Sequence, residues 1–177
     1  MDNRTKDIFA AWVQAIGTVL SAIGSTPFEN ISEEKLLALN LWGNELQASG
    51  NALAADAEEK FTLNKFGNQI QSIGNLVVIS GIIIEFNEVK KQLLDIQGNL
   101  LQALGGGTAL GDVFNKDPSI ELAYSLYGNL LQVIGNSLQA ISGTLELKGQ
   151  EATKLNVVGS WIQAIGSVIS ALGTTKY

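Results

Sequence analysis

Residues 128–143 read GNLLQVIGNSLQAISG, and in this stretch glycine recurs after seven residues and again after eight. A glutamine stands four positions after the first glycine, and leucine, valine and isoleucine fill many of the positions between. Seven residues make about two turns of an α-helix, whereas a β-strand requires alternation by two. The stretch therefore predicts a helix that carries a stripe of glycine along one side.

Five further segments repeat this unit, which in idealised form is G-N-x-L-Q-A-I-G. Every copy closes on a glycine, and every copy except the first, which has Ala10, also opens on one. The copies begin 24 to 33 residues apart, which is the length of one helix and a connection. This spacing predicts an all-α fold of about six antiparallel helices, arranged as three helical hairpins in a single domain over residues 1–177.

Turn and capping residues predict the limits of the helices. Ser32 is the expected N-cap of the second helix, GGG at 105–107 is the expected end of the fourth, and Asp117 with Pro118 is the expected start of the fifth. The β-rich stretch LVVISGIII at 76–84 is assigned to the third helix because Gly81 keeps the seven-residue phase. The expected helices cover about residues 5–24, 33–57, 62–85, 87–105, 118–143 and 150–173.

The glycine stripe lies opposite an apolar arc on each predicted helix. On a helical wheel the leucine and isoleucine positions span an arc about 100° wide, and glycine, glutamine, asparagine and serine share the other side. Glycine inside a helix costs about 1 kcal/mol relative to alanine, so close packing of backbones must compensate for it. We expect the apolar arcs to build the core and the glycine-glutamine faces to pack helix against helix, within or between subunits. The predicted helix-packing and assembly seam comprises Gly17, Gly24, Gly43, Gly50, Gly67, Gly74, Gly81, Gly98, Gly105, Gly128, Gly135, Gly159, Gly166, Gln14, Gln47, Gln71, Gln102, Gln132 and Gln163.

The composition argues against catalysis and against nucleic-acid binding. The chain has no histidine and no cysteine, which removes the commonest general base, the thiolate nucleophile and the usual zinc ligands. Its net charge of −6 and the lack of a basic stripe disfavour contacts to phosphates. The segment GGGTALGD at 105–112 lacks the Lys-Ser/Thr pair of a phosphate-binding loop. We therefore expect no enzymatic activity, no cofactor, no metal and no small-molecule substrate.

Charged residues gather between the repeat units and leave long neutral stretches. Residues 8–28, 66–84, 122–145 and 155–175 contain no Asp, Glu, Lys or Arg. One explanation is burial of these stretches against other copies of the protein, because symmetry then supplies a partner for every amide. The other explanation is membrane insertion, since about 20 residues span a bilayer and small residues suit helix packing in lipid.

Three features favour self-assembly over the membrane. Each neutral stretch contains glutamine together with asparagine or serine, Glu45 lies inside the second unit, and the mean hydropathy is only +0.19. The predicted function is that of a non-enzymatic structural protein that polymerises with itself into a filament, tube or sheet. A membrane-active or membrane-embedded helical protein, such as a pore-former or immunity-type factor, is the alternative.

The N-terminal segment and the repeat as a whole bear on location. Residues 1–25 have basic residues before an apolar stretch, as a signal peptide does, but that stretch is one copy of the repeat, so we expect the first helix of a cytoplasmic protein. The repeated units resemble a glycine-heptad family of repetitive proteins from Bacillus-type spore-forming bacteria. That resemblance implies a cytoplasmic protein of a Gram-positive bacterium with a connection to sporulation, and it implies no activity.

Overall fold

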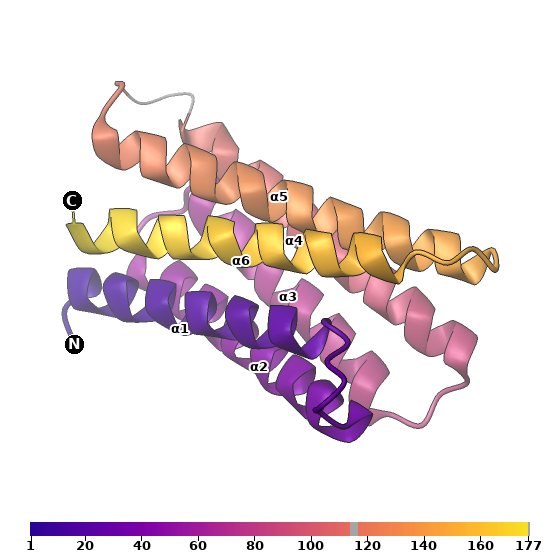
Figure 1. Ribbon diagram of the computed structural model, residues 1–177. Helices are drawn as coiled ribbons and strands as arrows, with labels where there is room; N and C mark the ends of the chain where they lie inside the picture. The colour runs from indigo at the N-terminus through magenta and orange to yellow at the C-terminus, as the bar shows by residue number, and fades with distance from the viewer. Residues whose placement is uncertain (114–116, 177) are drawn as a thin grey trace.

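The computed structural model describes residues 1–113 and 117–176, and within them the chain is helical throughout apart from short connections and ends (Figure 1). Antiparallel neighbours pair as three hairpins, α1 with α2, α3 with α4 and α5 with α6, so the predicted all-α architecture is confirmed. The helices are α1 (Asn3–Gly24), α2 (Glu33–Ala57), α3 (Leu63–Ile83), α4 (Glu88–Val113), α5 (Ile120–Leu147) and α6 (Thr153–Lys176).

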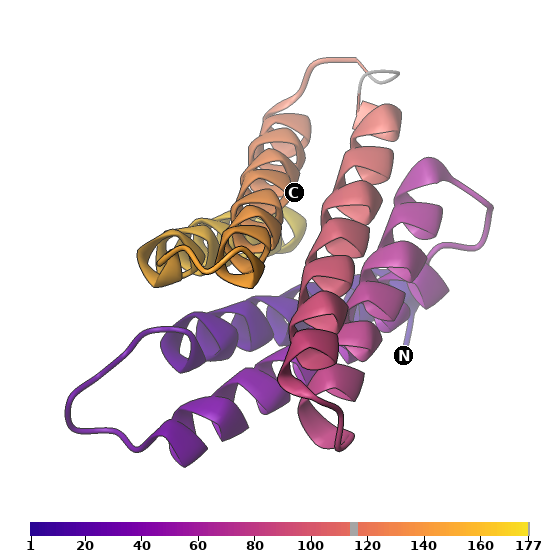
Figure 2. The same ribbon diagram turned by 90° about the vertical axis from the view of Figure 1, so that its right-hand side faces the viewer.

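The helices close into a ring. Each helix packs against the one before it and the one after it, and α6 returns to pack against α1. In the part of the chain that the structure describes, the backbones of no other pair of helices come within 8 Å of each other between Cα atoms. Both chain ends lie at one end of the ring, and the hairpins cross one another at an angle (Figures 1 and 2). The ring therefore has a lengthwise axis that no helix occupies.

Several helix starts follow the expected capping chemistry. Asp2 accepts a hydrogen bond from the backbone N–H of Thr5 at the start of α1, and Ser32 holds the N-cap position of α2 without a side-chain hydrogen bond. The expected Asp117 cap of α5 is wrong. Ser119 is the N-cap, with its hydroxyl accepting from the N–H of Leu122, because a serine two residues nearer the helix reaches that orphan donor directly.

The expected end of the fourth helix at GGG is also wrong, because α4 continues through the three glycines to Val113. A Cβ on Gly105 would lie 2.5 Å from the carbonyl oxygen of Gly67 in α3, and one on Gly106 would lie 2.8 Å from Val133 in α5. Two of the three glycines are therefore packing positions rather than a stop signal. Tertiary contact overrides the low helix propensity of glycine at this point.

The glycine seam lies inside the hairpins. The closing glycine of one unit faces the opening glycine of the next, and the relation is reciprocal: a Cβ on Gly74 would lie 2.7 Å from the carbonyl oxygen of Gly98, and a Cβ on Gly98 would lie 2.7 Å from that of Gly74. The facing pairs are Gly17 with Gly43, Ala10 with Gly50, Gly67 with Gly105, Gly74 with Gly98, Gly128 with Gly166 and Gly135 with Gly159. Gly24 and Gly81 extend the seam against Asn40 and Leu94 respectively. The seam thus brings paired helices into backbone contact within one chain.

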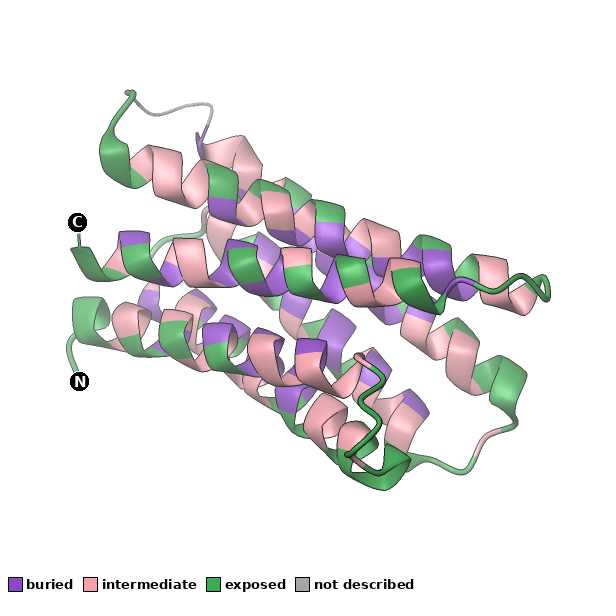
Figure 3. Ribbon diagram, in the orientation of Figure 1, coloured by how far each residue is buried: buried purple, intermediate pink, exposed green. Residues whose placement is uncertain are grey.

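The expectation that the apolar arcs build the core is wrong. Among the described residues, the buried apolar side chains are alanines together with Val78, Ile96 and Val113. The arcs instead face outward on every helix, and Ile16, Ile73 and Ile165 are each more than half exposed. Buried and exposed residues alternate along the helices (Figure 3). The physical reason is the seam, because backbone contact can form only where glycine stands, and this turns the polar side inward.

Candidate functional site

The glutamines of the six units converge on the axis of the ring. Gln47, Gln71, Gln102, Gln132 and Gln163 are each at most 4% exposed, and Gln14 is half-buried. Each unit places its glutamine near the middle of its helix, so the six amides gather at mid-length. The structure therefore turns all six repeat glutamines toward the interior and links five of them in two groups, Gln14 with Gln132 and Gln163 with Gln47 and Gln102.

Hydrogen bonds between these amides join helices whose backbones are not in contact. Gln163 on α6 donates from Nε2 to Oε1 of Gln47 on α2 at 2.8 Å and to Oε1 of Gln102 on α4 at 3.2 Å. Gln14 on α1 donates from Nε2 to Oε1 of Gln132 on α5 at 3.0 Å. In each pair one helix of the ring lies between the two that are joined, so the amide side chains reach across part of the interior at mid-length.

A second polar layer was not predicted to be buried. The residue after the closing glycine is at most 1% exposed at Thr18, Asn51, Asn75, Asn136 and Ser167. Among the described residues, Asn51 Oδ1, Asn75 Oδ1, Asn136 Nδ2 and Ser167 Oγ have no hydrogen-bond partner. Atoms of this kind are the ones that internal water satisfies in proteins. The sequence signal for this layer is the small polar residue that follows the closing glycine: asparagine in three units, threonine or serine in two.

The exterior is a belt of large apolar side chains. Among the helices that the structure describes, two are long and apolar enough to cross a bilayer by length and composition: α1, near the N-terminus, and α6. About a third of the most apolar stretch of each is buried. Glu45 is the exception on this surface. It lies exposed near the middle of α2, where its carboxylate accepts from the Ser49 hydroxyl at 3.4 Å.

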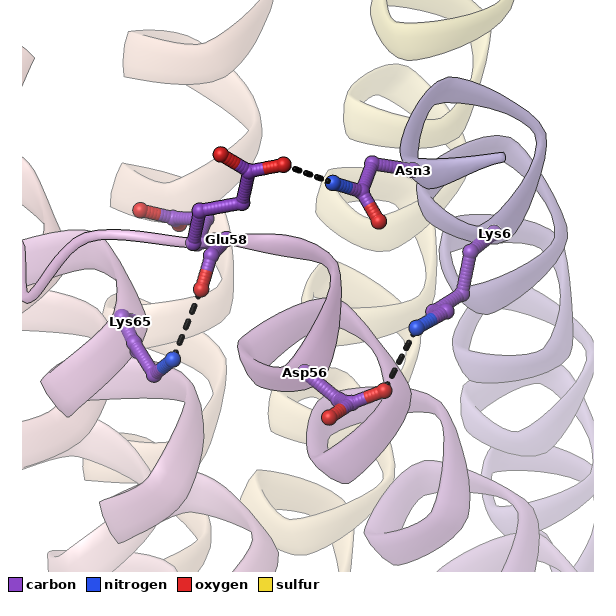
Figure 4. A network of polar contacts seen from close by, with 6 residues as sticks. Asn3, Lys6, Asp56, Glu58 and Lys65 are labelled. Atoms are coloured by element: carbon purple, nitrogen blue, oxygen red, sulfur yellow. Dashed lines mark hydrogen bonds and ion pairs between the residues drawn. The ribbon is translucent and has the colours of Figure 1, made fainter. Parts of the chain in front are cut away.

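Charged and polar contacts gather at the ends of the helices. Figure 4 shows Lys6 of α1 donating to the Asp56 carboxylate of α2 at 2.6 Å, and Lys65 donating to the carbonyl oxygen of Glu58 at 2.7 Å. The hydrogen bond from Lys6, helped by its charge, lowers the pKa of Asp56 below its ordinary value. At the neighbouring helix start, the N–H and hydroxyl of Thr5 likewise lower the pKa of Asp2. These exposed contacts fix how the hairpin ends meet and contribute little to stability.

The first and last units close the ring in a two-fold arrangement. Trp12 of α1 donates from Nε1 to Thr175 of α6 at 2.8 Å, and Trp161 of α6 donates to Thr26 after α1 at 3.0 Å. The sequences AWVQAIG at 11–17 and SWIQAIG at 160–166 explain this relation, since equal residues on two antiparallel helices lie on opposite sides of the midpoint of the pair. The tryptophans thus lie partly exposed at a helix junction rather than in a core.

The protein is all-α. Amide side chains lie inside its ring of antiparallel helices and large apolar side chains lie outside, which is the reverse of the distribution in a soluble domain. The sequence matches DUF6944, a family of unknown function, over residues 5–171, and the chain belongs to this family. No curated protein and no solved structure matches the chain.

Replacing Gln163 with leucine is expected to destabilise the fold by at least about 2 kcal/mol. The substitution leaves Oε1 of Gln47 and of Gln102 without their donor, and Nε2 of Gln139 without the acceptor it has at 2.9 Å. Thermal unfolding followed by circular dichroism measures the effect. The matched control is Gln69→Leu, which makes the same change on the exposed side of α3 and is expected to leave the midpoint unchanged. Equal midpoints for the two variants would show that the axial amides do not stabilise the ring.

Proposed function

We propose that this protein is a membrane-embedded helical protein whose apolar belt faces lipid and whose polar side chains line the interior of the helical ring. The observation that carries the proposal is the reversal of polarity: asparagine, glutamine, serine and glycine are buried, while leucine, isoleucine and tryptophan are exposed. In water this arrangement would leave a large apolar surface uncovered. In a bilayer it places each group in the medium that suits it.

The distribution of the apolar surface supports lipid as its cover. Exposed large hydrophobic residues occur on all six helices, for example Trp42 on α2 and Leu104 on α4. A lipid bilayer surrounds such a ring on every side, whereas contact with a single partner covers one side. The charge-free stretches of α1, α3, α5 and α6 are 19 to 24 residues long, which at about 1.5 Å per residue matches a hydrocarbon core about 30 Å thick.

The interior supports the same proposal. In lipid, helices associate through small residues that allow close backbone approach and through hydrogen bonds between polar side chains. The facing glycines within each hairpin supply the first, and the amides at mid-length supply the second. Polar residues of membrane helices face the interior of the bundle, as Gln102 and Gln132 do here.

Self-assembly in water is the second candidate, and Glu45 favours it. An exposed carboxylate at the middle of α2 is costly against lipid but tolerable against a polar group of another copy. The mean hydropathy of +0.19 points the same way. In this case the apolar belt, and not the glycine seam, is the surface through which copies join, because the glycines are already used inside the hairpins. A cytoplasmic location and a connection to sporulation remain predictions of this second candidate.

Fractionation of cells that produce the full chain tests the proposal. We expect the protein in the membrane pellet, resistant to extraction with alkaline carbonate, and released by mild detergent as particles of uniform size. The outcome that contradicts the proposal is recovery in the detergent-free supernatant. Negative-stain microscopy of that supernatant then decides the second candidate, since regular filaments, tubes or sheets support it and dispersed monomers exclude it.

A further inference from the structure

Two cavities lie at opposite ends of the ring axis. The first has a volume of about 500 Å³ and lies where α1, α3 and α5 begin; its lining includes Gln14 and Gln132. The second has a volume of about 160 Å³ and lies toward the other end; its lining includes Gln47, Gln102 and Gln163. Five of the six repeat glutamines thus line one cavity or the other, and Gln71 lines neither.

The amides close the axis through side chains alone. Gln14 reaches Gln132, and Gln163 reaches Gln47 and Gln102, while the backbones of these helices stay out of contact across the ring. Glutamine has three side-chain torsions, so rotation of these amides can open the axis without moving a helix. These contacts are therefore made by hydrogen-bonded groups that can rotate.

The lining of the first cavity is acidic. Arg4 is the only basic residue among the described residues that line it. The carboxylates of the lining are Asp7, Glu58, Asp112, Asp117 and Glu121. The second cavity has Asp95 among asparagines and serines. A cleft with one sign of charge raises the local concentration of counter-ions, so both cavities favour cations.

The acidic groups do not form a tight metal-binding site. Within the described ranges, no cluster of three or more carboxylates is placed to hold a metal ion. Conduction requires that an ion enters readily and leaves readily, and amide oxygens with dispersed carboxylates meet this requirement. We propose that the axis of the ring is a permeation path for small monovalent cations, closed at mid-length by the glutamine amides. This inference rests on the proposed membrane location.

Reconstitution of the full chain into vesicles of zwitterionic and anionic phospholipid tests the inference. Flotation first measures whether the protein inserts, and a potential-sensitive dye then reports the diffusion potential in a KCl gradient. We expect K⁺ flux above that of protein-free vesicles and a potential of the sign set by K⁺, with K⁺ about tenfold more permeant than Cl⁻. The variant Gln132→Ala, which removes one of the closing amides, is expected to raise the flux severalfold.

A matched pair of double variants isolates the acidic cavity. Asp117→Asn with Glu121→Gln removes two exposed carboxylates from the lining of the first cavity and is expected to lower the preference for K⁺ over Cl⁻. Glu33→Gln with Glu34→Gln removes the same charge from the exposed first turn of α2, outside both linings, and is expected to leave the preference unchanged.

Three results would overturn the inference. Protein that floats with the vesicles but carries no K⁺ flux excludes the path while leaving the membrane location intact. Equal permeability to K⁺ and Cl⁻, or equal effects of the two double variants, excludes cation selection by this cavity. Protein that does not float with the vesicles removes both the inference and the proposed function.

Discussion

The variant Gly105→Ala is expected to melt about 4–8 °C below the wild-type protein, which corresponds to about 2 kcal/mol for a chain of this size. The added Cβ would lie 2.5 Å from the carbonyl oxygen of Gly67 and 2.9 Å from the backbone N of Gln71. Both obstacles are backbone atoms, so α3 and α4 must separate along the seam. The resulting loss of packing outweighs the gain of about 1 kcal/mol in helix propensity.

Gly107 provides the matched control two residues further along the same helix. A Cβ at this position meets nothing within 4 Å, so Gly107→Ala keeps only the gain in helix propensity and is expected to raise the midpoint by about 2–4 °C. Thermal unfolding by circular dichroism in a mild detergent compares the two variants under one condition. If both alanines stabilise the protein equally, α3 and α4 do not approach through the seam, and the hairpin packing described here is wrong.

Much of the fold could be predicted from the spacing of glycine alone. A period of seven identifies helices. The copies are spaced by about one helix and a short connection, which identifies antiparallel pairs, so the three hairpins follow from the sequence. The exact ends of helices could not be predicted, because GGG at 105–107 carries the same local signal whether it stops a helix or packs within one. Only the position of Gly67 on the neighbouring helix decides between these outcomes.

The repeat alone did not predict which side of each helix faces the interior of the ring. A helical wheel separates an apolar side from a polar side, but it does not say which medium lies outside. In water the apolar side turns inward, and in lipid no such drive exists between helices. The glycine seam resolves the choice for this chain, since its backbone contacts orient Gln47 and Asn75 inward and leave Ile73 outside. The convergence of the glutamines at one height is a consequence of that orientation.

The substitution Ile165→Lys is expected to reduce membrane insertion more than a hundredfold. Ile165 lies at the middle of α6 and is 54% exposed on the apolar belt. Exchanging isoleucine for lysine at the centre of a membrane helix costs about 3–4 kcal/mol, and each 1.4 kcal/mol is a factor of about ten. The measurement is the share of the protein that stays in the membrane pellet after carbonate extraction.

The control for this variant is Gln150→Lys, which adds the same charge in the exposed connection between α5 and α6. It is expected to leave the membrane share unchanged, because a loop at the end of the ring lies in water.

The same pair of variants distinguishes the two candidate functions. If the wild-type protein polymerises in water through its apolar belt, Ile165→Lys instead converts polymers to soluble, folded particles while Gln150→Lys leaves them intact. Retention of Ile165→Lys in the membrane at the wild-type level would show that this side of α6 does not face lipid.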